Sequence, residues 1–182
     1  AKIYCADFQF HCGAFEVKDD GTFGAILPEN VPADAVDLNG ATVIPGLVDV
    51  HNHGNSGADF SDGDYEGLLK MARYLAKEGV TSFAPASMTL PYEVLENAFA
   101  TAKKLHNDRP ADCARLMGIQ MEGPYFSEKK KGAQNGAYLK NPDFDGFKKL
   151  YDDCDGLVRI VDIAPELPGS IEFVEQASKL CT

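Results

Sequence analysis

The chain has 182 residues, which is long enough for a domain with a sizeable core. Its content of 45% hydrophobic and 25% charged residues is typical of a globular protein in water. The net charge of −11 argues against general nucleic-acid binding, which needs a basic surface, so we expect no nucleic-acid partner. No apolar run approaches the roughly 20 residues that span a bilayer, so we expect no membrane partner.

The cysteine pattern favours the cytoplasm. The five cysteines are an odd number at wide spacing, and no Cys-x-x-Cys occurs among them. Residues 1–7 lack the basic segment and the long apolar core of a signal peptide. We therefore expect reduced thiols in a cytoplasmic protein.

Residues 1–44 predict short β-strands. The apolar or alternating runs are residues 3–5, 8–10, 14–17, 25–28 and 35–40. A turn signal, Asp19-Asp20-Gly21, separates two of them. This is too little sequence to close a β-sandwich around a core.

From Ala41 the pattern changes to alternating strands and helices, which indicates an α/β domain with parallel strands, whose bounds we set at 45–182. The predicted strands are 43–53, 80–86, 115–122 and 157–164. The predicted helices are 65–78, 91–106, 143–152 and 171–180, with Ser170 as the N-cap of the last one. In the first helix the apolar residues at helical spacing are Leu68, Leu69, Ala72, Leu75 and Ala76.

Four βα units do not close an eight-stranded barrel. Such a chain would have two unpaired sheet edges, so we expect it to associate or to be marginally stable alone. The alternative is a small open α/β sheet that is complete in itself.

The segment 43–54 carries the first candidate site. Its density of Val, Ile and Leu predicts a strand buried on both faces. Residues two apart on a strand face the same side, so His51 and His53 would present two imidazoles at its C-terminal end. Two imidazoles that converge suit a divalent transition metal. The alternative is a surface turn that happens to contain two histidines.

Three carboxylates lie close to predicted strand ends. Glu122 ends the third predicted strand and would face the same side as the two histidines; the alternative is a solvated acid. Asp49 lies two residues before His51 and would support that site or accept a buried hydrogen bond. Glu166 follows the fourth predicted strand and would orient the metal surroundings, or it has no chemical role.

The segment 43–54 resembles the first metal-binding strand of the amidohydrolase superfamily. Three further segments narrow the match: Gln-Met-Glu-Gly-Pro-Tyr-Phe at 120–126, Lys-Lys-Gly-Ala-Gln-Asn at 130–135 and Ala-Pro-Glu at 164–166. In this order they resemble the N-acetylglucosamine-6-phosphate deacetylase family, from about Ala41 to the end of the chain.

The resemblance implies a fold and a boundary. Residues 45–182 would form the first four βα units of a TIM (β/α)8 barrel, and residues 1–44 would be part of a small β-sandwich domain. The chain would be the N-terminal half of the enzyme. Two further histidine ligands and the aspartate that transfers a proton would then lie beyond Thr182, so the 182 residues alone would be inactive.

The resemblance also implies the ligands of the site. Glu122 would bind the metal, joined by His51 and His53. Zinc is the first expectation, with iron, cobalt or manganese as alternatives. Some members of the family keep His-x-His and can hold two metals, whereas others replace both histidines with amides.

Ala133 and Gln134 match the pair that contacts the substrate in the family. Relatives often have histidine at the second position, and glutamine cannot carry its charge. The neighbouring lysines 129–131 would add local positive potential near a phosphate, or they form an ordinary solvated loop.

The implied function is deacetylation of N-acetylglucosamine 6-phosphate to glucosamine 6-phosphate and acetate by metal-activated hydroxide. The partner would be a small amino-sugar phosphate, and the full-length protein would be a homodimer. One alternative is a deacetylase of N-acetylgalactosamine 6-phosphate. Another is a non-catalytic folded fragment or assembly module.

Overall fold

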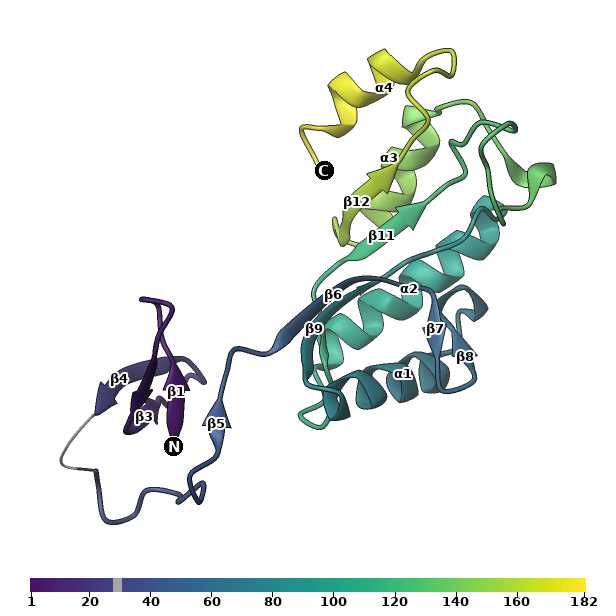
Figure 1. Ribbon diagram of the computed structural model, residues 1–182. Coiled ribbons are helices and arrows are strands. Elements are labelled where there is room, and N and C mark those ends of the chain that lie inside the picture. Colours follow the sequence, from purple (N-terminus) through teal and green to yellow (C-terminus); the bar gives the residue numbers. More distant parts are fainter. Residues whose placement is uncertain (28–30) are drawn as a thin grey trace. The chain divides into compact units, whose positions relative to one another are not determined.

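The structure is a computed structural model that describes residues 1–27 and 31–182. The chain divides into two compact units, Ala1–Gly46 and Leu47–Thr182 (Figure 1). Because each unit has its own internal contacts, the two are described separately.

The smaller unit contains five short strands: β1 (Lys2–Tyr4), β2 (Phe10–Cys12), β3 (Ala14–Val17), β4 (Phe23–Leu27) and β5 (Thr42–Val43). β1 pairs with β2 in antiparallel and with β5 in parallel orientation, and β3 pairs with β4 as an antiparallel hairpin. The predicted turn at Gly21 is confirmed, since Gly21 has a φ of +79° between β3 and β4.

Two predicted strands of this unit differ from the structure. Of residues 8–10 only Phe10 lies in a strand, β2, because the chain bends at Phe8, which has a φ of +62°. Residues 35–40 form no strand, because the Asp37 carboxylate accepts a hydrogen bond from the backbone N–H of Asn39 at 2.8 Å and turns the chain. The end of the predicted run 25–28 lies outside the described residues.

The smaller unit has almost no core. Ile3 is the only hydrophobic residue buried among its described residues, at 6% exposure. Phe23 and Val17, on the hairpin, are 74% and 61% exposed. This agrees with the prediction that residues 1–44 are too few to enclose a core of their own.

The larger unit alternates strands and helices. Its strands are β6 (Leu47–Asn52), β7 (Gly54–Asn55), β8 (Ala58–Asp59), β9 (Val80–Pro85), β10 (Arg115–Leu116), β11 (Ile119–Glu122) and β12 (Val158–Asp162). Its helices are α1 (Tyr65–Lys77), α2 (Tyr92–Asp108), α3 (Phe144–Asp153) and α4 (Ser170–Ala177), with short 3-10 turns η1 (Phe60–Asp62) and η2 (Gly136–Tyr138). The pairs β6–β9, β9–β10 and β11–β12 are all parallel, which confirms the α/β class.

The third predicted strand, 115–122, forms two short strands, β10 and β11, which pair with different neighbours. β10 pairs with β9, and β11 pairs with β12. A single parallel bridge from Ala86 to Gln120 joins the two ladders, so the strands follow one another in chain order (Figure 1). The break falls at Gly118, where a Cβ atom would meet the side chain of Arg159 and lie 3.2 Å from the carbonyl oxygen of Leu157. The segment that leads into β12 therefore packs tightly against the chain at this glycine.

The core of the larger unit lies between its helices and its strands. The predicted apolar face of α1 is largely confirmed, because Leu68, Leu69, Ala72 and Leu75 are buried. Ala76, which was predicted on this face, is exposed. Met71, which was not predicted, is fully buried, since the buried stripe steps by three and four residues.

The predicted cap of the last helix is also wrong. Gly169, with a φ of +85°, is the N-cap of α4. Ser170 is the first residue of the helix, and its hydroxyl donates a hydrogen bond to the carbonyl oxygen of Ala164 at 2.8 Å. The serine thus closes the turn after β12 rather than capping α4.

β6 is less buried than its sequence predicted. Leu47, Val48 and Val50 are 57%, 67% and 51% exposed. The reason is that β6 pairs only with β9 among the described strands, so it is an edge strand. An apolar run alone does not show whether a strand has two neighbours.

In residues 1–27 and 31–182, no helix is long and apolar enough to cross a membrane. All five cysteines are free thiols.

We predict that Phe147→Ala lowers the free energy of unfolding by about 3–5 kcal/mol. Phe147 is fully buried and packs against Phe144, Tyr151 and Phe173, so truncation leaves a cavity. Urea unfolding would measure the change. Ile171→Ala, at a side chain that is 64% exposed, is the control and should stay within about 0.5 kcal/mol. Equal losses in both variants would contradict the described core.

Candidate metal centre

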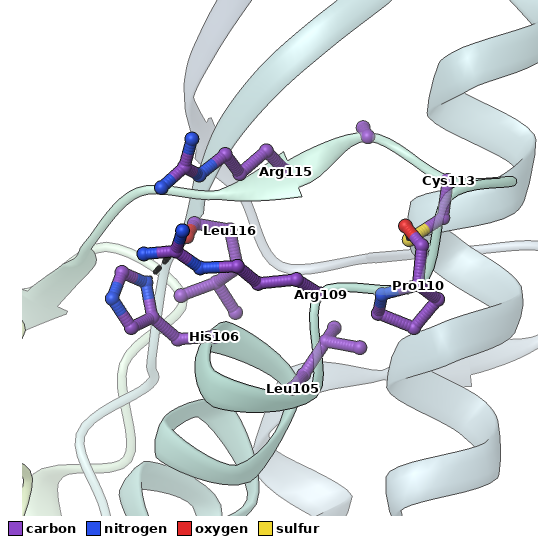
Figure 2. A pocket seen from close by; sticks show the side chains of 8 residues that line it. Leu105, His106, Arg109, Pro110, Cys113, Arg115 and Leu116 are labelled. Carbon is purple, nitrogen blue, oxygen red and sulfur yellow. Dashed lines mark hydrogen bonds between the residues drawn. The ribbon is translucent and has the colours of Figure 1, made fainter. Parts of the chain in front are cut away.

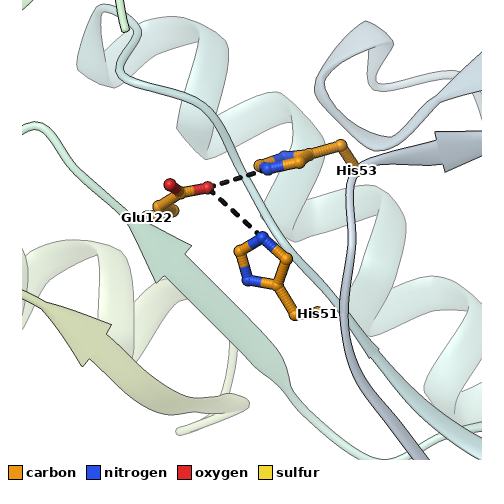
Figure 3. Close-up of side chains that lie close together, drawn as sticks. All are labelled: His51, His53 and Glu122. Carbon is orange, nitrogen blue, oxygen red and sulfur yellow. Dashed lines mark ion pairs between the residues drawn. The ribbon is translucent and has the colours of Figure 1, made fainter. Parts of the chain in front are cut away.

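Two strands bring three side chains to one point. His51 lies in β6, His53 follows it directly, and Glu122 is the last residue of β11. One ligand atom from each of the three lies within 4.8 Å of the others. The Nε2 atoms of His53 and His51 are 2.8 Å and 3.7 Å from Oε2 of Glu122 (Figure 3). The structure therefore brings together the three residues that the sequence singled out.

Hydrogen bonds fix which ring nitrogen of each histidine faces the carboxylate. Nδ1 of His51 lies 2.9 Å from Oε1 of Gln120, and Nδ1 of His53 lies 3.0 Å from the carbonyl oxygen of Ala86. Both partners are oxygen atoms that only accept, so each Nδ1 must donate a proton. A neutral imidazole then carries its lone pair on Nε2. Both lone pairs therefore point toward Glu122.

This arrangement fits a cation. Oε2 of Glu122 is buried and makes no hydrogen bond in the structure. Two nitrogen lone pairs and a carboxylate oxygen repel one another unless a positive charge lies among them. Two ligands of a tetrahedral zinc ion lie about 3.4 Å apart, close to the separations seen here. The three residues therefore suit a divalent metal with nitrogen and oxygen ligands.

Asp49 holds the end of β6. Its Oδ1 accepts a hydrogen bond from the backbone N–H of His51 at 3.0 Å, and its Oδ2 accepts one from the side-chain amide of Asn52 at 3.1 Å. Asp49 is thus a hydrogen-bond acceptor that shapes the strand end, and its carboxylate is outside the cluster of His51, His53 and Glu122.

The turn after Glu122 requires glycine. Gly123 has a φ of +91°, a conformation that disfavours any side chain. A Cβ atom there would also lie 3.3 Å from the Cα atom of Thr89. The turn therefore packs directly on the segment after β9, which keeps the Glu122 carboxylate at the strand end.

Gln134 ties the loop after β11 to the segment after β9. Its side chain is 5% exposed, and Oε1 accepts a hydrogen bond from the backbone N–H of Thr89 at 2.7 Å. Lys131 donates a hydrogen bond to the carbonyl oxygen of Gln134 at 3.2 Å. Ala133 is exposed. The contact of Ala133 and Gln134 with substrate stays a prediction, and the structure adds a role for Gln134 in holding the loop.

The remaining candidates lie outside the cluster. Glu166 is exposed in the turn after β12, and its carboxylate is not among the three grouped ligands in the described part of the chain. Lys129 and Lys130 are exposed on the loop after β11. Their proposed roles stay predictions.

Two tyrosines that the sequence analysis missed hold the segment between β11 and α3. The hydroxyls of Tyr92 and Tyr125 lie 2.8 Å apart, and that of Tyr125 donates to the carbonyl oxygen of Asp143 at 3.1 Å. Burial, together with the nearby charge of Asp143, raises the pKa of Tyr92 to about 12. Burial also raises the pKa of Tyr125. No spacing rule connects residues from three different segments, so only the fold shows this network.

Gln120 and Asp162 are further residues that the sequence analysis left without a role. The Gln120 side-chain amide donates to Oδ2 of Asp162 at 2.7 Å, while its oxygen faces His51. Gln120 lies two residues before Glu122 on the same strand, so strand alternation could have placed it beside the metal ligands. Nothing in the spacing marked Asp162.

A separate pocket of about 150 Å³ lies beside the start of β10 (Figure 2). Arg109, Arg115 and His106 line it, and Nδ1 of His106 donates to the carbonyl oxygen of Leu116 at 2.8 Å. Guanidinium groups repel a metal cation. This pocket is therefore unsuited to a metal, and it shares no residue with the cluster at the end of β11.

We predict that removing the cluster abolishes metal binding. The wild-type chain should bind close to one Zn²⁺, whereas the double variant His51→Ala, His53→Ala and the variant Glu122→Gln should lose affinity by more than about 100-fold. Calorimetric titration and elemental analysis would measure this. His11→Ala, at an exposed histidine of the smaller unit, is the control and should bind as the wild type does. Metal retained after loss of both histidines would refute the site.

We predict that the tyrosine network stabilises the fold only while it is protonated. The folded pKa of Tyr92 lies above the ordinary value of about 10, so its stabilisation is complete below about pH 10 and is lost as the pH rises toward about 12. Urea unfolding across this range should show a smaller decline in Tyr92→Phe than in the wild type. Tyr138→Phe, an exposed tyrosine outside the network, should decline as the wild type does.

No family model matches the chain. The N-acetylglucosamine-6-phosphate deacetylase of Vibrio furnissii is 33% identical over 160 residues, which cover 87% of this chain and 40% of that protein. The N-acetylgalactosamine-6-phosphate deacetylase of Escherichia coli O157:H7 is 29% identical over 156 residues, which cover 85% of this chain and 40% of that protein.

Solved structures give the same result. The N-acetylglucosamine-6-phosphate deacetylase of Thermotoga maritima superposes with a TM-score of 0.76 at 25% identity, over 98% of this chain and 45% of that one. A variant of the Mycobacterium smegmatis enzyme in complex with N-acetyl-D-glucosamine-6-phosphate gives a TM-score of 0.71 at 28% identity, over 87% of this chain and 40% of that one.

The chain thus spans about 40% of the length of the curated relatives that it matches. Sequence and structure agree on one family, which confirms the resemblance noted in the motifs. This chain is a relative of the N-terminal part of the N-acetylglucosamine-6-phosphate deacetylases.

Proposed function

We propose that the protein containing this chain hydrolyses the acetamide of N-acetylglucosamine 6-phosphate and releases acetate and glucosamine 6-phosphate. The observation that carries the proposal is the cluster of His51, His53 and Glu122, whose ligand atoms lie within 4.8 Å of one another. It is supported by the names of the relatives, which act on this class of amino-sugar phosphate.

The position of the cluster suits an active site. Glu122 ends β11 and His53 follows β6, so the metal would lie at the C-terminal ends of parallel strands. In (β/α) barrels this end carries the catalytic groups. When bound, a divalent cation, for which zinc is our first proposal and iron, cobalt or manganese are alternatives, acts as a Lewis acid toward water and toward the amide carbonyl.

The residues of this chain would hold and orient the reacting groups. His51, His53 and Glu122 would bind the metal, and Asp49 would keep β6 in the shape that presents the histidines. The loop that Gln134 fastens would lie over the substrate, with Ala133 exposed on it. We assign transfer of the proton to the leaving amine to an aspartate outside these 182 residues, as the family resemblance implies.

The fold also supports proposals about the domains and the location of the whole protein. The parallel strands in chain order support the first four βα units of a TIM barrel over residues 45–182. The nearly coreless smaller unit supports part of a β-sandwich over residues 1–44. The five free thiols support the cytoplasm as the location. A homodimer of the whole protein stays a proposal that rests on the resemblance alone.

The choice between two sugars is the main alternative. One relative acts by name on the galactosamine analogue, and its similarity is no greater than that of the glucosamine relatives. The two sugars differ only in the configuration of one hydroxyl. We therefore place glucosamine first and use the galactosamine compound as a comparison in the assay.

We predict that the protein, as its gene encodes it, releases acetate from N-acetylglucosamine 6-phosphate in the presence of Zn²⁺. The rate should exceed that with N-acetylgalactosamine 6-phosphate or with unphosphorylated N-acetylglucosamine, and a chelator should abolish it. Acetate release would be measured by a coupled enzymatic assay. Glu122→Gln should be inactive and His11→Ala should be active. Metal-bound protein that releases acetate from none of the three sugars would refute the proposed reaction and favour a non-catalytic module.

A further inference from the structure

Three strands contribute to a chain of hydrogen bonds behind one metal ligand. Nδ1 of His51, in β6, lies 2.9 Å from Oε1 of Gln120, in β11. Nε2 of Gln120 donates to Oδ2 of Asp162, at the end of β12, at 2.7 Å. The carboxylate, the amide and the imidazole are thus joined in a single line that ends at the ring facing Glu122.

We propose that Gln120 and Asp162 are positioning residues that fix the tautomer of His51 and thereby make its Nε2 the metal-binding atom. This inference rests on the metal centre of the proposed function and adds two residues to it. Among the described residues, their side chains make hydrogen bonds only to His51 and to each other, so both act through His51.

Asp162 sets the direction of the amide. A carboxylate accepts hydrogen bonds and donates none, so it selects the NH₂ group of Gln120 rather than its oxygen. The oxygen of Gln120 must then face His51. Because that oxygen accepts only, Nδ1 of His51 carries the proton and Nε2 keeps its lone pair for a metal.

Reversal of the amide would remove the ligand. With the NH₂ group turned toward His51, Nδ1 would accept the hydrogen bond and the proton of the neutral ring would move to Nε2. A protonated Nε2 cannot bind a metal. Asp162 prevents this reversal, because the amide oxygen of Gln120 would then face the carboxylate of Asp162, and two acceptor oxygens repel each other.

His53 has no such freedom. Its Nδ1 donates to the backbone carbonyl oxygen of Ala86 at 3.0 Å, and a backbone carbonyl between two strands cannot rotate. The two histidines are thus held in the same tautomer by different means. One partner is fixed by the fold itself, and the other is a side chain that needs a second residue to orient it.

Burial strengthens the hydrogen-bond chain from Asp162 through Gln120 to His51, which we call the relay. Gln120 is 9% exposed, so water cannot readily replace either of its partners. Loss of a buried hydrogen bond is costly, so the amide of Gln120 strongly favours the orientation that keeps both of its partners. The register supports the same geometry, because Glu122 lies opposite Asp162 in the β11–β12 ladder.

The test compares Asp162→Leu with the wild type in the metal-free protein. Long-range ¹H–¹⁵N spectra at about pH 8, where an ordinary histidine is neutral, report which ring nitrogen is protonated. We expect the Nδ1-protonated form for His51 in the wild type and a mixture, or the Nε2-protonated form, in the variant. His53 should keep the Nδ1-protonated form in both and serves as the internal reference.

Zinc affinity is the second measurement. Asp162→Leu should weaken binding by about 10- to 100-fold, the usual effect of losing a partner behind a metal ligand. Glu175→Leu removes an exposed carboxylate from α4 and is the matched control, with an unchanged affinity expected. If Asp162→Leu does not fold, Asp162→Asn keeps the shape of the side chain. Its amide can donate as well as accept, so a mixture of His51 tautomers is expected there too.

The outcomes separate this inference from the proposed function. An unchanged His51 tautomer and an unchanged zinc affinity in the Asp162 variants would overturn the relay, even if the metal centre and the deacetylase activity stand. A tautomer change without zinc binding in any form of the protein would refute the metal centre and leave the hydrogen-bond relay intact. A tautomer change together with the loss of affinity would support both.

Discussion

The register of the parallel strands is the constraint on which the candidate site depends. A slip of one residue turns every side chain of a strand to the opposite face. His51, Gln120, Glu122 and Asp162 come from three strands and must all face one side for the cluster and its relay to exist. The pairing of Glu122 with Asp162 and the bridge between Ala86 and Gln120 fix the register of β11, and the pairing of Asn52 with Pro85 fixes that of β6. The metal centre is therefore a consequence of how the sheet is paired.

Several polar groups near the strand ends are paired with one another or with the backbone. Asp49 bonds the backbone at His51, Gln134 bonds the backbone at Thr89, and Gln120 links His51 with Asp162. Buried polar groups without partners are costly, so such pairs make the geometry of this edge more rigid. Buried side-chain oxygens of Asn52, Ser87, Thr89 and Glu122 make no hydrogen bond. Glu122 is the charged one among them, and a buried carboxylate oxygen without a hydrogen bond suits a cation site.

The two units differ in how much apolar surface they bury. The larger one has a continuous core of helix and strand residues, whereas the smaller one buries a single hydrophobic side chain among its described residues. The edge strand β6 also exposes Leu47, Val48 and Val50. The two histidines thus lie on or beside an exposed edge strand of the described chain. They depend on β9 and β11 for support, and not on neighbours at the other edge.

The sequence by itself determined the order of strands and helices, the α/β class and the identity of the three clustered residues. Hydrophobic periodicity marks the elements, and the spacing of His51 and His53 follows directly from strand alternation. The motif around Glu122 supplied the third residue through a family resemblance.

Only the tertiary structure decided the rest. The exposure of β6, the break at Gly118, the partners of Ser170, and the links from Gln120 to Asp162 and from Tyr92 to Tyr125 all depend on which strands and loops become neighbours. Contacts between residues far apart in the chain leave no periodic trace in the sequence, because they are set by strand pairing and packing. The fold therefore adds to three predicted ligands the residues that aim them.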